Sequence, residues 1–219
     1  MKGIGKMRNQ KTNNKFISLF SEHIINNIRE YIIVIIFLLI GVVIGAIFIN
    51  NISQDESMQI KDYLSNFITA LKTDYQIDKI TLLKQSVTEN IILATAIWFA
   101  GACVIGIPVV YAIVTFRGFC LGYTISALAM SFGSTKAIVF ALLTILLQNI
   151  VFIPAILAES VSGIKLYKSI MKDRRKENIK LEILKHTIFS LFILIAFILS
   201  SIIEVYISNN ILMIFINYF

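Results

Sequence analysis

IILATAIWFAGACVIGIPVVYAIVTFRGFCLGYTISALAMSFGST, residues 91–135, contains a single charged side chain, Arg117, in 45 residues. At about 1.5 Å per residue, one helix of this length would be about 67 Å long. The hydrocarbon core of a bilayer is only about 30 Å thick. We therefore expect two membrane spans, residues 91–116 and 118–135, with Arg117 at or near their junction.

Arg117 is predicted to be a topology anchor at a cytoplasmic turn, because basic residues favour the cytoplasmic ends of spans. The alternative is a functional charge in the middle of the membrane, which is costly and rare. Pro108 should kink or break the first of the two spans, since proline cannot continue the helical hydrogen bonding. A re-entrant or half-broken element at Pro108 is left open.

The composition requires lipid as the main solvent of this chain. Of its 219 residues, 57% are hydrophobic and 15% are charged, and the mean hydropathy is +0.81. A soluble domain carries about a quarter charged residues. The net charge of +7 gathers at the ends of apolar runs, which indicates membrane topology rather than nucleic-acid binding. Cys103 and Cys120 lack metal-type spacing and are interpreted as small packing residues.

Three further apolar runs, residues 31–49, 137–158 and 187–208, complete an all-α, polytopic membrane protein with five transmembrane helices. The chain before residue 31 has six basic and two acidic residues, and the basic loop 159–186 has eight basic and four acidic residues. Since cytoplasmic segments are rich in Lys and Arg, we expect the N-terminus inside. Five spans then place the tail, residues 209–219, outside.

The N-terminal segment 1–30 is predicted to contact lipid before the first span begins. Phe16, Phe20, Ile24 and Ile28 recur every four residues, which places them on one face of a helix. We expect an amphipathic helix on the inner leaflet.

Two glycine pairs predict close contacts between helices. GVVIG at residues 41–45 and GFCLG at residues 118–122 both have glycines four residues apart inside predicted spans. Small residues at this spacing let helix backbones approach each other in a membrane, although the pattern is common.

The long polar segment 50–90 is predicted to be an extracytoplasmic loop of two short amphipathic helices. Ser53 and Glu56 have the spacing of a capping box at a helix start. Apolar residues then follow on one helical face, and we take them as candidates for binding a protein partner: Ile60, Leu64, Phe67, Ile68 and Leu71. The alternative is that this face packs on the protein itself or on lipid.

Polar side chains within predicted spans are the next candidates for function. Gln148 and Asn149 lie in the fourth span and Glu204 lies in the fifth, near its outer end. Unpaired amides are costly in hydrocarbon, so we expect hydrogen bonds between helices. A polar lining for a substrate path is the alternative.

Sequence signatures of catalysis are missing. His23 and His186 are the two histidines of the chain, and both lie at predicted cytoplasmic ends of spans, so no intramembrane haem or metal ligand pair is expected. No phosphate-binding loop or activated nucleophile is recognisable. We expect no cofactor and no enzymatic activity.

Several blocks of the chain resemble the stage II sporulation protein M family. They are HIINNIREYIIVIIFLLIGVVIGAIFIN, VIGIPVVYAIVTFRGFCLGYTISAL, LLQNIVFIPA and the late Glu204, and the resemblance extends from about residue 17 to the C-terminus. It implies a multi-pass protein of the bacterial cell membrane that acts in forespore engulfment and lies at the septum. It also implies a scaffold for two peptidoglycan hydrolases, stage II sporulation proteins P and D.

Other interpretations remain at this stage. A small transporter or channel subunit is the competing class, and the polar residues of the fourth span with Glu204 favour it. Self-association into a homo-oligomer is left open.

Overall fold

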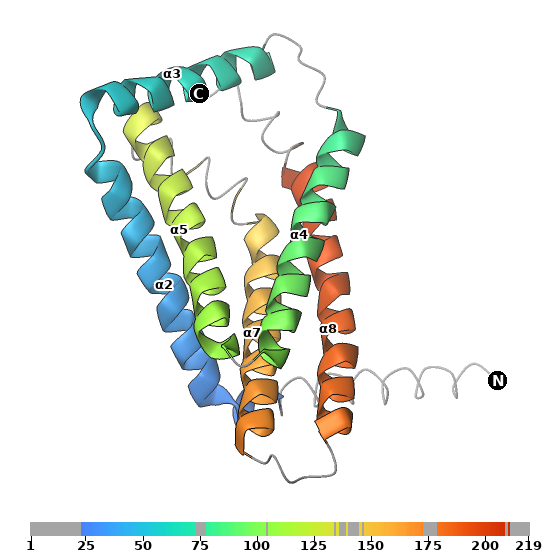
Figure 1. The fold of residues 1–219 in the computed structure, drawn as a ribbon. Coiled ribbons are helices and arrows are strands. Elements are labelled where there is room, and N and C mark those ends of the chain that lie inside the picture. The colour runs from blue at the N-terminus through green and yellow to red at the C-terminus, as the bar shows by residue number, and fades with distance from the viewer. Residues whose placement is uncertain are drawn as a thin grey trace, which may run out of the picture.

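The computed structural model describes residues 23–72, 78–103, 105–133, 135, 139, 145, 147–172, 179–208 and 210. Within these residues the chain is helical, without a strand. The long helices are α2 (Ile28–Asn50), α3 (Gln54–Lys72), α4 (Lys79–Ala102), α5 (Gly106–Phe132), α7 (Leu147–Lys172) and α8 (Ile179–Ile202). A π-helix, η2 (Ile203–Ser208), continues α8. Helix α3 lies across one end of the bundle that the other helices form (Figure 1), and we call this the α3 end.

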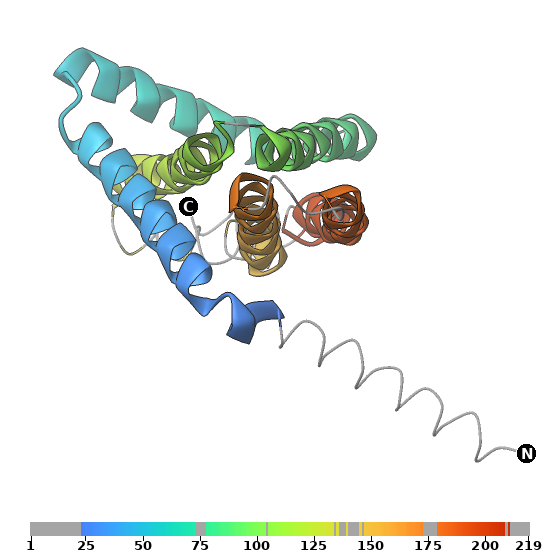
Figure 2. The same cartoon turned by 60° about the horizontal axis from the view of Figure 1, so that its bottom comes forward.

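In the part of the chain that the structure describes, four helices are long and apolar enough to cross a membrane: α2, α5, α7 and the continuous run of α8 with η2. Helix α4 is not among the four, because its first three turns are polar. In the candidate span of α7, 61% of the residues are buried, against 28% in each of the other three. Helix α7 is therefore the central helix, with the others around it (Figure 2).

The core draws side chains from all five helices of the bundle. Val34 of α2, Ile97 of α4, Val114 of α5, Phe152 of α7 and Phe197 of α8 are each fully inaccessible to solvent. Helix α4 thus contributes to the same core as the four candidate spans.

Helices α2 and α5 pack closely through the two glycine pairs. A Cβ on Gly41 or Gly45 would collide with the carbonyl oxygens of Thr115 or Phe119 of α5. A Cβ on Gly118 or Gly122 would collide in turn with backbone carbonyls of α2. Both pairs were predicted as close contacts, and the structure shows that they face each other.

The prediction that Arg117 lies at a turn is wrong. Helix α4 ends at Ala102 and α5 begins at Gly106, so the break between the second and third expected spans lies between these two residues, and α5 runs through Arg117 without interruption. Pro108 is in the first turn of α5, where a missing amide proton costs little, so the break expected near this proline is present. The charge-based boundary failed because a single arginine does not interrupt a helix.

The polar segment between α2 and the second span differs partly from the prediction. Ser53 and Glu56 form the expected capping box: the backbone N–H and Oγ of Ser53 donate to the Glu56 carboxylate at 3.0 and 2.9 Å. One amphipathic helix, α3, follows. The second expected helix is instead the start of α4, which continues unbroken to Ala102 after its N-cap Asp78.

The expected basic loop 159–186 is also largely helical. Helix α7 continues past Ala158 to Lys172, and α8 begins at Ile179. We call the end of the bundle where α7 stops and α8 starts the basic end, because Lys165, Lys168 and Lys185 lie there. The predicted amphipathic segment before His23 and the tail after Asn210 lie outside the described residues.

Candidate functional site

A cluster of hydrogen-bonded polar side chains lies inside the bundle, in the half nearer the α3 end. It consists of Ser86 and Asn90 of α4, Gln148 of α7, Ser201 of α8 and Glu204 of η2, and we call it the polar cluster. Oε2 of Glu204 accepts hydrogen bonds from Nε2 of Gln148 at 2.7 Å and from Oγ of Ser86 at 2.5 Å. Nδ2 of Asn90 donates to Oγ of Ser201 at 2.8 Å. These bonds connect α4, α7 and the last helical segment.

The local helix geometry positions Glu204. Glu204 lies in the π-helix η2, whose backbone hydrogen bonds run from residue i to residue i+5, and such segments occur frequently at functional sites. Ser86, Asn90 and Ser201 are buried, so their polar atoms need partners within the protein. Of the predicted intramembrane residues, Gln148 and Glu204 are brought together directly.

Asn149, the third predicted residue, does not join the polar cluster. Its Nδ2 donates to the carbonyl of Ile145 on its own chain segment at 2.6 Å. Its Oδ1 is buried and has no hydrogen-bond partner among the described residues. The adjacent amides therefore have different environments, which the sequence could not distinguish.

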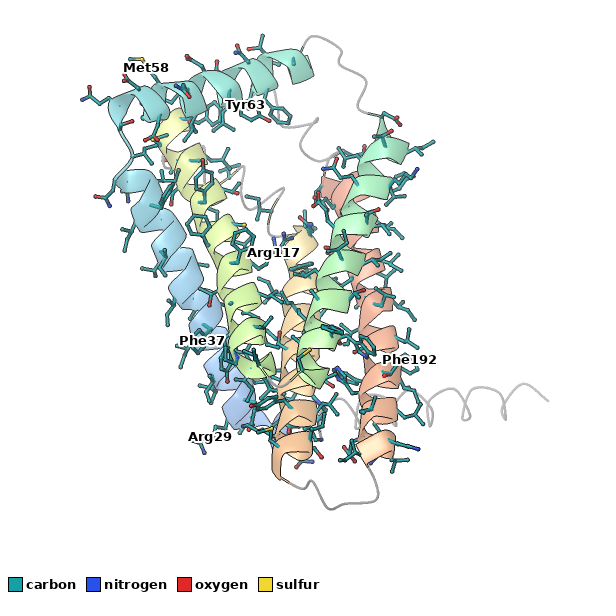
Figure 3. All side chains as sticks on the ribbon, viewed as in Figure 1. Arg29, Phe37, Met58, Tyr63, Arg117 and Phe192 are labelled. Carbon is teal, nitrogen blue, oxygen red and sulfur yellow. The ribbon has the colours of Figure 1, made fainter. Side chains whose placement is uncertain are left out.

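Arg117 lies in the middle of α5 and faces α7 (Figure 3). Its guanidinium carbon is 4.3 Å from the centre of the Phe152 ring, a cation–π geometry. It forms no ion pair with another described residue, and its Nε is buried without a hydrogen-bond partner in this part of the chain. The side chain is thus an interior charge held on an aromatic face; a functional role for this charge stays a prediction.

Two buried pairs nearer the basic end were missed by the sequence analysis. Glu159 of α7 is fully buried and accepts a short hydrogen bond from Oγ of Ser190 of α8. Oγ of Ser162 and Nδ1 of His186 form a hydrogen bond of 2.8 Å. Three of these residues fell in the segment assigned to a loop. The small residues of ESVSG, residues 159–163, indicate close helix packing. This signal was not used, because the charged residues that follow led to the assignment of a loop.

The side chains of the predicted partner-binding face of α3 differ in burial: some pack on the bundle and one is exposed. Ile68 is buried, and Ile60 and Leu64 line a cavity of about 420 Å³ with Tyr123 of α5. Phe67 is exposed, and the side chain of Leu71 lies outside the described residues.

Metal ligation has no support in the described residues. No group of three or more His, Cys, Asp or Glu side chains among them could hold a metal ion. His23 and His186 are each engaged by a neighbouring hydroxyl, of Tyr31 and Ser162 respectively.

Comparison with known proteins gives the family. The family model described as stage II sporulation protein M matches residues 34–209. The chain belongs to the stage II sporulation protein M family. The match includes both glycine pairs, Arg117 and the whole polar cluster. Searches of the curated proteins and of the solved structures find no match. Membership in the stage II sporulation protein M family, with four apolar helices, indicates a membrane protein related to sporulation.

Proposed function

We propose that this protein is a non-enzymatic membrane scaffold that holds extracytoplasmic peptidoglycan hydrolases at the septum during forespore engulfment. Family membership supports a role in sporulation. The hydrolases are stage II sporulation proteins P and D, as the resemblance implies. The observation that carries the proposal is helix α3, a folded amphipathic surface at one end of the membrane bundle.

The scaffold requires α3 to lie outside the cytoplasm. Lysines concentrate at the basic end, whereas α3 begins with Asp55 and Glu56, and cytoplasmic ends of spans are rich in Lys and Arg. We infer five spans, namely the four apolar helices and α4, because Ile97 and Ala100 of α4 are buried in the shared core. The N-terminus is then inside and the C-terminus outside.

Cysteine labelling tests this topology. After replacement of Cys103 and Cys120 by alanine, cysteines are placed at the exposed positions Ser65 of α3 and Lys180 of α8. A membrane-impermeant maleimide should label Ser65→Cys in intact cells and Lys180→Cys only after lysis. Labelling of the cysteine at position 180 in intact cells would overturn the orientation.

Three apolar or aromatic side chains described on α3 are exposed, although Tyr63 also lines the cavity between α3 and α5. Met58 is 67%, Tyr63 71% and Phe67 42% exposed. The helix is fixed to the bundle by buried Ile68 and by a hydrogen bond from Oγ of Ser57 to the sulfur of Met130 of α5, 3.3 Å long. A rigid helix with exposed rings suits the docking of a partner, since binding energy concentrates in a few large side chains.

Phe67 gives the direct test of hydrolase docking. Phe67→Asp should leave the protein inserted at normal abundance, because this ring is not part of the core. A fluorescently tagged hydrolase should then fail to gather at the septum, and engulfment should stop. Ser65→Asp is the matched control, which adds the same charge at an exposed position of α3 without removing an apolar group. Normal septal localisation in Phe67→Asp would refute docking on this helix.

The polar cluster favours a second candidate, a small transporter or channel subunit. A hydrogen-bonded carboxylate between helices is a feature of ion and proton pathways. The test is flux of ions or protons into proteoliposomes that contain the purified protein. Flux that Glu204→Gln abolishes would favour transport over the scaffold.

A further inference from the structure

A second cavity lies at the basic end, between the start of the described chain, α7 and α8. Its volume is about 160 Å³, and its lining includes His23, Ser162, Lys165, Lys185, His186 and Phe189. The cavity lies far from the polar cluster and from α3, so neither the scaffold nor the transport interpretation uses it.

The charges around this cavity are not balanced. The third charged residue of the lining, Glu182, pairs with Lys185 at 2.8 Å. One turn beyond Lys165, Lys168 pairs with Glu30 at 2.8 Å. Lys165 forms no ion pair with another described residue. One positive charge at the cavity therefore lacks a negative partner in this part of the chain.

Two contacts position His23 at the edge of the cavity. Its Nδ1 is 3.2 Å from the hydroxyl of Tyr31, and its ring stacks on Phe189 with centroids 4.8 Å apart. Burial, and then the Lys165 ammonium, lower the pKa of His23, which favours the neutral ring. With Nδ1 accepting from Tyr31, Nε2 would carry a proton and remain as a donor.

The lipid-facing surface of α8 adjoins the cavity. Leu181, Lys185, Ile188 and Phe192 recur at helical spacing on one face, and the three apolar side chains of this set are 46 to 59% exposed. Phe192 points away from the bundle in Figure 3. A cationic pocket beside an apolar helix face matches the two parts of an anionic phospholipid, whose headgroups bind basic pockets between transmembrane helices.

We propose that this cavity binds the phosphate of an anionic phospholipid headgroup, with Lys165 and Lys185 as the cationic contacts and His23 as a hydrogen-bond donor. The acyl chains then lie along Ile188 and Phe192. Free phosphate shares the headgroup chemistry but would gain nothing from this apolar face.

Thermal unfolding of the purified full-length protein in neutral detergent tests the site. The probes are dioctanoyl phosphatidylglycerol, dioctanoyl phosphatidylcholine and sodium phosphate at equal concentration. Phosphatidylglycerol should raise Tm, since a ligand that binds the folded state stabilises it, and phosphatidylcholine and phosphate should not. The double variant Lys165→Gln, Lys185→Gln should lose most of this rise.

Two further variants make the result decisive. Lys180→Gln removes an exposed charge of α8 that does not line the cavity, and it should keep the full rise in Tm. Lys165→Arg, Lys185→Arg keeps both charges and should keep most of the rise. An equal loss in Lys180→Gln, or no loss in the Lys165→Gln, Lys185→Gln double variant, would overturn the site. A rise with sodium phosphate as large as that with phosphatidylglycerol would overturn the lipid as its ligand.

Discussion

Gln148 of α7 donates a hydrogen bond from Nε2 to Oε2 of Glu204 in η2, across 2.7 Å. The same oxygen accepts the Oγ proton of Ser86 of α4. One carboxylate thus joins three helical segments that are distant in the sequence. In a membrane these bonds hold helices together where hydrophobic attraction between them is weak.

Replacing Gln148 by leucine should lower the free energy of unfolding modestly. Hydrogen bonds between helices in membranes average about 0.6 kcal/mol and reach about 1.7 kcal/mol. A double-mutant cycle of Gln148→Leu with Glu204→Gln should give a coupling energy in this range, measured by unfolding in bicelles. Asn149→Leu is the matched control, because Asn149 bonds to the carbonyl of Ile145 and should show no coupling to Glu204. Equal coupling of both amides would contradict the structure.

The contact of α2 with α5 should fail when a glycine gains a large side chain. At Gly122 a Cβ already meets the carbonyl oxygen of Val42, so Gly122→Leu must push the helices apart. We expect a loss of about 1–3 kcal/mol or more, the typical cost of inserting extra bulk into a packed contact, and a fall in the amount of folded protein. Gly163→Ala is the control, since its nearest neighbours are 3.5 Å from the added carbon. Size-exclusion profiles and Tm in detergent measure the folded state of both variants. A Gly122→Leu variant as stable as the unmodified protein would rule out this packing.

The sequence predicted those features that depend on local spacing. The glycine pairs, the capping box at Ser53 and the break near Pro108 each follow from a few neighbouring residues. Gln148 and Glu204 were identified because polar groups in apolar runs must find partners. Their direct contact could not be predicted, since it depends on the three-dimensional arrangement of α7 and η2.

Arg117 and Glu159 show where sequence reasoning failed. Arg117 was treated as a topology anchor and Glu159 as part of the basic cytoplasmic loop, because charges in membrane proteins ordinarily lie outside the spans. In the structure a Phe152 ring covers the guanidinium, and Ser190 donates to the buried carboxyl group. These partners lie on other helices, so composition and spacing contained no sign of them.

Acidic pH should fray the starts of α3 and α4. Hydrogen bonds from Ser53 lower the pKa of Glu56, and those from Thr81 and Ile80 lower the pKa of Asp78. A carboxyl group whose pKa is lower in the folded state stabilises the folded helix start at pH values above its pKa in the unfolded chain, which is about 4. This stabilisation is lost as the pH falls through the folded value. Amide exchange at Ser57 and Leu82, corrected for the intrinsic rate, should therefore increase below about pH 4.

A variant separates the two helix starts. Glu56→Gln should remove the pH dependence at α3 and leave that at α4 unchanged, because the Asp78 cap is independent. Unchanged pH dependence at Ser57 in Glu56→Gln would show that another group titrates there.

Arg117 should be stabilised by the ring of Phe152. The guanidinium lies 4.3 Å from the ring centre, and cation–π pairs removed from water contribute about 0.5–2 kcal/mol. A double-mutant cycle of Arg117→Gln with Phe152→Leu, followed by unfolding in bicelles, should give a coupling energy in that range. Arg117→Lys should retain part of it, because the charge remains while the planar stacking surface is lost. Phe116→Leu is the matched control: this ring is adjacent to Arg117 in α5 but is 67% exposed, and should show no coupling. Additive effects of the Arg117 and Phe152 variants would mean that the arginine depends on some other contact.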